Sequence, residues 1–174
     1  DVAEAILEKL AVEIKDKNLK PKLAIILAGN NPSSRIYVNN KIKAAQRVGV
    51  DVALYEFSQE ELKRCLKTIE KLNEDPKING IIVQYPVYDN WNFDEFESSI
   101  DLQKDVDGFH PVNVGKMVLG LPAYLPATPY GIIQLLERYK IETAGKHCVV
   151  IGRSHIVGSP ISILMSRNAY PGNC

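Results

Sequence analysis

The stretch Lys22-Leu-Ala-Ile-Ile-Leu-Ala28 is apolar at every position after its lysine, and Gly29-Asn-Asn-Pro32 interrupts it. A continuous apolar run of this length is typical of a strand that is buried on both faces, as in a parallel sheet covered by helices. Parallel strands need long crossover connections, which are usually helical. The stretch therefore predicts an α/β fold with helices on both sides of it in the sequence.

The flanking sequence has the expected helical patterns. Residues 2–17 place apolar side chains among charges at helical spacing, and Pro21 follows them. On the other side, Ser33 or Ser34 is the predicted N-cap of a helix that runs to about Val48 and leaves through Gly49.

The alternation continues towards the C-terminus. We expect a strand over 50–57, a helix capped by Ser58 and running to about Leu72, a strand over 81–83 and a weaker helix over 93–100. This order predicts an N-terminal α/β domain with a mostly parallel sheet. Ligands of such sheets bind beyond the carboxyl ends of the strands, so the loops at 29–34 and 84–86 are the places to look for chemistry.

The stretch 101–129 is rich in proline and glycine, and we expect it to be mostly irregular, as a domain connection or a cleft lining. A helix over 130–139, a strand over 146–151, a turn over 152–158 and a helix over 160–167 are predicted after it.

Composition excludes several classes of function. The chain has 174 residues, with 21 Lys plus Arg balanced by 21 Asp plus Glu, and the charges alternate along it. Nucleic acids and anionic membranes both require a basic face, so neither is an expected partner. No apolar run approaches the roughly 20 residues of a membrane span, and no signal peptide is apparent at the first residues.

The three cysteines, Cys65, Cys148 and Cys174, are odd in number and widely spaced. They form neither a disulfide framework nor a metal-binding Cys-x-x-Cys pair, which favours a reducing, cytoplasmic location. The three histidines lack the spacing of a zinc site, and no serine or cysteine motif indicates an acyl-enzyme, so no metal is expected.

Tyr37 and Lys41 lie four residues apart on the helix after the first strand and therefore share one face. A lysine in a partly dry cleft loses some preference for its charged form and becomes useful for proton transfer. The alternative is a surface tyrosine packed on the aliphatic stem of the lysine.

Gln84 directly follows the third strand, in Val83-Gln-Tyr-Pro86, where a neutral amide can accept from an ammonium and donate to a substrate oxygen. A polar loop residue that satisfies backbone groups is the alternative. In Lys104-Asp-Val-Asp107-Gly108 one carboxylate can enter a site and bind an amidine or guanidine edge with two hydrogen bonds. A local turn or an ion pair with Lys104 would be the structural reading of the same residues.

The segment Gly152-Arg-Ser-His-Ile-Val-Gly158-Ser-Pro160 forms a turn between a predicted strand and a helix. Backbone N–H groups and the helix dipole then point at an anion, as in dinucleotide sites, although the glycine spacing is not the usual Gly-x-Gly-x-x-Gly. Arg153 would contact a phosphate, which favours NADP over NAD, and a purely structural turn is the alternative.

Five segments together resemble the methylenetetrahydrofolate dehydrogenase/methenyltetrahydrofolate cyclohydrolase family. They are Ser34-Arg-Ile-Tyr-Val-Asn-Asn-Lys41, Gly80-Ile-Ile-Val-Gln-Tyr-Pro86, Lys104-Asp-Val-Asp-Gly-Phe-His-Pro-Val-Asn113, Thr128-Pro129 and Gly152 to Pro160, in the order of the family. Ala127 stands where some members have a cysteine, so we expect no thiol role there.

The resemblance implies a role for each candidate. Lys41 would be the catalytic lysine, Tyr37 would orient and pack on the folate, and Gln84 would hydrogen-bond Lys41. Asp107 would bind the amino edge of the pterin. Gly152, Arg153 and Ser154 would hold the phosphates of NADP, with NAD as a possible replacement.

The resemblance also implies the activity and the domain organisation. The enzyme would oxidise 5,10-methylenetetrahydrofolate with NADP and hydrolyse the methenyl product to 10-formyltetrahydrofolate, as a cytoplasmic homodimer in one-carbon metabolism. A monofunctional dehydrogenase and a folate-binding chain without turnover are the alternatives. We expect a folate-binding catalytic domain over 1–125 and, over 126–174, the first part of a Rossmann-like NAD(P)-binding domain that is truncated at Cys174.

Overall fold

The computed structural model describes all 174 residues, which form two compact units, 1–106 and 107–174. Unit 1 contains a three-stranded parallel sheet with the strand order β2-β1-β3. Its elements are α1 (Val2–Asp16), β1 (Lys22–Ala28), α2 (Pro32–Val48), β2 (Asp51–Phe57), a 3-10 turn (Gln59–Glu61), α3 (Leu62–Glu74), β3 (Gly80–Val83) and α4 (Phe93–Ser99).

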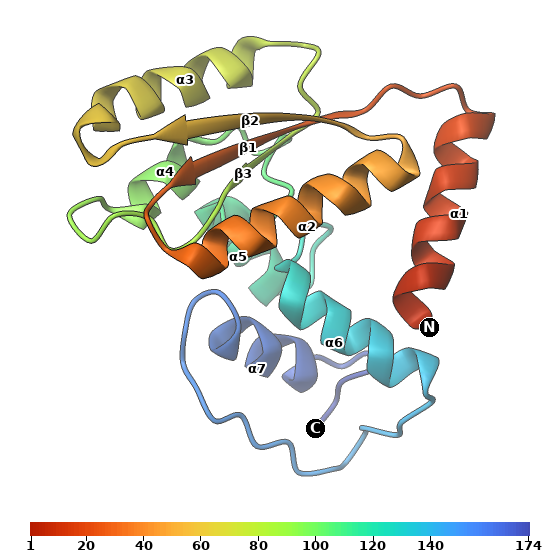
Figure 1. The fold of residues 1–174 in the computed structure, drawn as a ribbon. Coiled ribbons are helices and arrows are strands. Elements are labelled where there is room, and N and C mark those ends of the chain that lie inside the picture. The colour runs from red at the N-terminus through yellow and green to blue at the C-terminus, as the bar shows by residue number, and fades with distance from the viewer. The chain divides into compact units, whose positions relative to one another are not determined.

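The central strand β1 confirms the reading of the apolar run. Alternate side chains of a strand point to opposite faces, and here both faces are covered. Ile25 and Leu27 pack with Val38 of α2 on one face, while Ala24 and Ile26 belong to a larger cluster on the other. Figure 1 shows α2 and α3 on opposite sides of the sheet.

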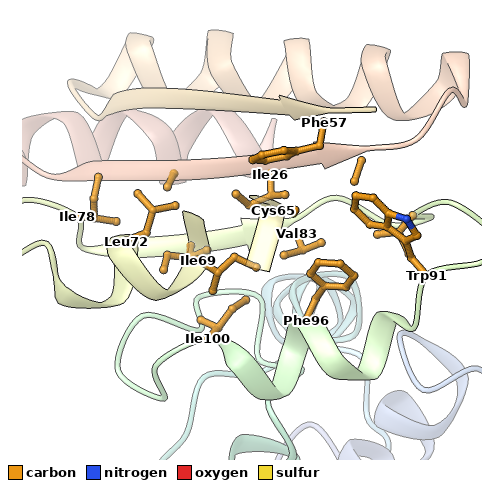
Figure 2. Close-up of a cluster of buried hydrophobic side chains, with 14 residues drawn as sticks. Ile26, Phe57, Cys65, Ile69, Leu72, Ile78, Val83, Trp91, Phe96 and Ile100 are labelled. Atoms are coloured by element: carbon orange, nitrogen blue, oxygen red, sulfur yellow. The ribbon is translucent and has the colours of Figure 1, made fainter. Parts of the chain in front are cut away.

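The larger cluster joins the sheet to α3 and α4. Figure 2 shows Ile26 and Val83 of the sheet facing the side chains of these two helices. Its labelled helical members are Cys65, Ile69 and Leu72 of α3, and Phe96 of α4, with Trp91 stacked on the Phe96 ring at a centroid distance of 5.4 Å. This packing fixes the carboxyl ends of the strands, where the candidate residues lie.

Three sequence predictions need correction within and after unit 1. The N-cap of α2 is Asn31, whose side chain accepts from the Ser33 N–H at 2.9 Å, because Pro32 starts the helix earlier than the predicted Ser33 or Ser34. The stretch 101–129 is irregular over more than half of its length, as predicted, but it also contains α5 (Pro111–Leu119), which was not predicted, and the start of α6 (Ala127–Arg138). Proline is compatible with the first turn of a helix, and Pro111 begins α5 in that way.

Unit 2 packs α5, α6 and α7 (Gly158–Ser166) around Met117, Ile133 and Leu164. The third correction concerns the predicted strand over 146–151, which does not form. Val149 is 82% exposed and Ile151 is 99% exposed. A strand needs a hydrogen-bonded neighbour, and unit 2 contains no strand that could pair with this segment.

None of the helices is both long enough and apolar enough to span a bilayer.

Candidate functional site

The N-terminal half of α2 carries the first group of candidate residues. Ser34, Tyr37 and Lys41 follow one another at spacings of three and four residues, so they lie on one face of the helix. Ser34 is buried, Lys41 is half-buried and Tyr37 is 62% exposed. This face of α2 therefore begins at the buried Ser34 and continues through the exposed ring of Tyr37 to the half-buried Lys41.

The loop after β3 contacts this face through one carbonyl group. The Ser34 hydroxyl lies 3.5 Å from the Tyr85 carbonyl oxygen, and the Gln84 amide donates to the same oxygen at 2.9 Å. Gly29 is also adjacent to the loop, because a Cβ on it would lie only 3.0 Å from the Pro86 carbonyl oxygen. The Tyr85–Pro86 peptide bond is cis. Gln84 and the face of Tyr37 and Lys41 thus belong to one region of unit 1.

Gln84 has an unusual hydrogen-bonding state. It is only 9% exposed, and its backbone N–H donates to the Ile26 carbonyl at 2.9 Å, which extends the β1–β3 ladder by one residue. Its side-chain oxygen Oε1 is buried and accepts no hydrogen bond. A buried acceptor without a donor costs about 1–3 kcal/mol, so the site contains a position that favours an incoming N–H or O–H group.

Tyr88 and Trp91 connect the loops at this edge of the sheet, and neither was predicted as a site residue from the sequence. The Tyr88 hydroxyl lies 3.2 Å from the Asn30 side-chain oxygen and 3.2 Å from the Phe57 carbonyl oxygen. The Trp91 indole N–H donates to the Gln59 carbonyl at 3.0 Å. The loops after all three strands are therefore joined, and the only signal in the sequence was the aromatic content of the segment 85–93.

Lys104 contacts the end of α3. Its ammonium donates to the carbonyls of Leu72, Asn73 and Asp75 at 2.8, 2.7 and 2.8 Å, which uses its three protons at the C-terminus of α3. Asp107 is half-buried and is the first residue of unit 2, whereas Tyr37, Lys41 and Gln84 belong to unit 1.

The turn before α7 contains the candidate phosphate-binding residues. The Ser154 hydroxyl oxygen accepts from the N–H groups of Val157 and Gly158 at 3.1 and 3.2 Å, and the Ser154 carbonyl accepts from the Ser159 N–H at 3.0 Å. Gly152 has φ +143°, and Arg153 is exposed at the surface of the turn.

Gly158 makes this turn possible. A Cβ on it would lie 2.6 Å from both the carbonyl carbon and the carbonyl oxygen of Gly152. The backbone of 152–153 therefore packs directly on the first residue of α7. Such a close turn, with an exposed arginine beside a helix N-terminus, suits the phosphates of a dinucleotide.

The structure contains no cluster of three or more histidine, cysteine, aspartate or glutamate side chains that could hold a metal ion.

Comparison with protein families gives two matches that together cover most of the chain. Residues 1–107 match the model of the tetrahydrofolate dehydrogenase/cyclohydrolase catalytic domain. Residues 126–173 match the model of the NAD(P)-binding domain of the same enzymes.

Individual proteins agree with these matches. The chain is 51% identical over 156 residues to the bifunctional protein FolD of Azobacteroides pseudotrichonymphae, a match that covers 89% of this chain and 53% of that protein. The crystal structure of the FolD methylenetetrahydrofolate dehydrogenase/cyclohydrolase from Campylobacter jejuni is similar with a TM-score of 0.83 and 41% identity, over 93% of this chain and 58% of that one.

A second solved structure carries information on the cofactor. The methylenetetrahydrofolate dehydrogenase-cyclohydrolase of Trypanosoma brucei, in complex with NADP and an inhibitor, is similar with a TM-score of 0.87 and 30% identity, over 94% of this chain and 58% of that one. The chain thus spans about half the length of the curated relatives it matches.

Proposed function

The chain belongs to the tetrahydrofolate dehydrogenase/cyclohydrolase family, and from this premise we propose that the protein catalyses two consecutive steps on folate. It oxidises 5,10-methylenetetrahydrofolate to the methenyl form with NADP, and it hydrolyses the methenyl form to 10-formyltetrahydrofolate. This activity belongs to one-carbon metabolism, whose formyl product is a donor for purine biosynthesis.

The observation that carries the proposal is the unpaired Oε1 of Gln84. This buried acceptor lies in the loop whose Tyr85 carbonyl also contacts the helical face of Lys41. A lysine N–H, of the amine or of the ammonium, is a donor that would satisfy it. Gln84 accordingly orients Lys41 and helps to set its protonation state.

Both steps favour a neutral Lys41 at their start. Oxidation leaves a positive charge on the methenyl folate, so a neutral lysine beside it is less repulsive than an ammonium. Hydrolysis adds water to the methenyl carbon, releases one proton and opens the ring. Lys41 accepts a proton from the attacking water and returns one to the nitrogen that leaves, which is general base and then general acid catalysis.

In this proposal Tyr37 and Asp107 each contribute a contact to the folate. The open ring of Tyr37 packs on the aromatic part of the folate, one helical turn from Lys41. Asp107 accepts two hydrogen bonds from the amino edge of the pterin.

Gly152, Arg153 and Ser154 bind NADP, the acceptor of the hydride in the first step. The close packing of Gly152 on Gly158 and the helix N-terminus beside them fit a dinucleotide phosphate. Arg153 carries the charge for the 2′-phosphate, and NAD is the weaker alternative. We further propose that the protein is a cytoplasmic homodimer.

Two assays of the full-length protein test the proposal. It should reduce NADP in the presence of 5,10-methylenetetrahydrofolate, and it should hydrolyse methenyltetrahydrofolate faster than buffer does. Reduction without hydrolysis would identify a monofunctional dehydrogenase. Folate binding without either reaction would identify a binding protein.

Lys41→Met should reduce cyclohydrolase turnover by at least about a hundredfold, since a positioned acid–base group contributes about 10²–10⁴ in rate. The decrease should be in kcat, measured from the loss of methenyl absorbance, with circular dichroism showing an unchanged fold. Lys43→Met is the matched control, because Lys43 is exposed and lies two residues further along α2. Full hydrolysis by Lys41→Met would remove Lys41 from its proposed role.

A further inference from the structure

Cys148 and Cys174 lie far apart in the chain but line the same cavity of unit 2, which has a volume of about 400 Å³. Both are free cysteines at exposed positions, and their side chains form a hydrogen bond with each other. Neither residue takes part in the proposed reaction. A pair of thiols in contact is the arrangement from which a disulfide forms, because that bond requires the two sulfurs to approach closely.

Hydrogen bonds of the backbone hold Cys174 in this place. Its thiol donates to the Thr143 carbonyl at 3.3 Å. One residue earlier, the Asn173 carbonyl accepts from the Gly145 N–H at 2.9 Å. The segment that ends in Cys174 therefore lies beside the segment that leads to Cys148, and the contact of the two thiols follows from the course of the chain.

The two thiols differ in what surrounds them. Partial desolvation and the adjacent Cys148 sulfur raise the pKa of the Cys174 thiol, so Cys174 holds its proton and can donate it to a Cys148 thiolate. Lys146 and His147 line the same cavity, and the positive charge of Lys146 attracts an anionic oxidant. Cys148 is therefore the attacking thiol of the pair, and Cys174 is the resolving thiol.

We propose that Cys148 and Cys174 form a reversible disulfide by exchange with a small anionic disulfide, of which glutathione disulfide is the test compound. The Cys148 thiolate attacks one sulfur of glutathione disulfide, whose S–S bond breaks and releases one glutathione thiolate. The Cys174 sulfur then attacks Cys148 in the mixed disulfide, gives up its proton and releases the second glutathione. Two protein thiols are oxidised, and one glutathione disulfide is reduced to two glutathione molecules.

The disulfide links the two ends of the candidate cofactor-binding segment. It closes a loop over 148–174, which contains the turn 152–158 and α7. A cross-link of this kind stabilises the folded state by restricting the unfolded chain. In a reducing compartment the pair stays a dithiol, and the disulfide forms when the oxidised share of small thiols rises. The pair thus makes the stability of this segment sensitive to redox conditions.

Peptide mapping of the full-length protein tests the proposal. The protein is equilibrated in glutathione buffers from reducing to oxidising, its remaining thiols are blocked with an alkylating agent, and it is digested with trypsin. Cleavage after Lys146, Arg153 and Arg167 separates the two cysteines into two peptides. Mass spectrometry should find these peptides joined in the oxidising buffers and separate after reduction. The oxidised protein should also have a Tm about 5 °C above that of the reduced protein.

Three variants serve as controls. Cys148→Ser and Cys174→Ser should each leave the other cysteine as a mixed disulfide with glutathione and should lose the rise in Tm. Cys65→Ala should keep both the linked peptides and the rise, because Cys65 is buried in unit 1. Separate glutathione adducts on Cys148 and Cys174 of the wild type, or two reduced thiols in every buffer, would overturn the proposed pair. Linked peptides with an unchanged Tm would overturn its effect on stability.

Discussion

Gln84 is buried on a strand end with one half of its amide satisfied and the other half unpaired. The cost of the unpaired oxygen is tolerated because the backbone of the same residue is fixed to Ile26 and the Tyr85 carbonyl takes the amide N–H. The residue type and its position after a strand indicated a site. Its unpaired oxygen could not be predicted, because it depends on the packing of segments that are far apart in the sequence.

Gly158→Ala should disrupt the turn that precedes α7. The new methyl group would lie 2.6 Å from the Gly152 carbonyl, and both partners are backbone, so neither can move away cheaply. We expect a destabilisation of about 1–3 kcal/mol and weaker NADP binding, measured by urea unfolding and by fluorescence titration. Gly131→Ala is the control, because a Cβ there meets no atom within 4 Å. Equal stability of the two variants would contradict this account of the turn.

Because of Cys65, the free energy of unfolding should decrease as the pH rises in the alkaline range. Burial in the core raises the pKa of its thiol from 9.0 to about 12, and the charge of Glu61 adds to the shift. Above about pH 8.5 the unfolded chain ionises this thiol while the folded chain keeps it protonated. The contribution of the buried Cys65 thiol to the free energy of unfolding is thus complete below that pH, and it is lost as the pH rises towards 12.

We therefore expect the free energy of unfolding of the wild type to fall relative to that of Cys65→Ala by about 1.5–2 kcal/mol between pH 8 and pH 10. Urea unfolding at both pH values measures the difference. Cys148→Ala, a change at an exposed thiol, should show no such convergence. A constant gap between the wild type and Cys65→Ala would contradict the burial argument.

Helix α3 depends on a cation from a different part of the chain. The carbonyl groups at a helix C-terminus lack intrahelical partners and carry a partial negative charge. Lys104 donates to Leu72, Asn73 and Asp75 at this end and so anchors the segment after α4 to α3.

Lys104→Met should lower the free energy of unfolding by about 2–3 kcal/mol, because three carbonyls lose a charged donor while the aliphatic part is kept. The change is measured by urea unfolding followed through Trp91, the single tryptophan of the chain. Lys77→Met is the control at an exposed position nearby. A loss below about 0.5 kcal/mol would show that solvent replaces Lys104 at these carbonyls.

The sequence predictions were accurate for elements that depend on neighbouring residues, and less accurate for elements that depend on partners far away in the sequence. Strands β1, β2 and β3 were predicted to within about a residue, because each is a buried apolar run between clear breakers. The segment 146–151 has the same pattern but forms no strand, since strand formation requires a partner that the pattern does not reveal. Helix α5 was missed because Pro111 was interpreted as a breaker, whereas it is the first residue of the helix.

The division into two units also determines which residues can be assigned together. Tyr37, Lys41 and Gln84 belong to unit 1, while Asp107 and the turn 152–158 belong to unit 2. The folate-binding domain is predicted from the sequence to extend to residue 125, and that boundary stays a prediction. The compact units instead divide after Val106, because Val114, Met117 and Leu125 pack with the helices of unit 2.

Unit 1 should fold alone, and unit 2 should not. Residues 1–106 contain a complete three-stranded sheet with apolar clusters on both faces. This segment also includes Lys104, which binds the end of α3. Residues 107–174 contain three helices around one small cluster, and they leave Val149 and Ile151 exposed. A core of this size rarely stabilises a domain of about 70 residues without further support.

Expressed separately, residues 1–106 should unfold in one cooperative transition in urea, seen at the same midpoint by Trp91 fluorescence and by circular dichroism. Residues 107–174 should show a broad, non-cooperative change in circular dichroism and should bind a hydrophobic dye through their exposed side chains. Cooperative unfolding of 107–174 would mean that its helices suffice as a core. Its absence in 1–106 would mean that the sheet of unit 1 needs the rest of the chain for its stability.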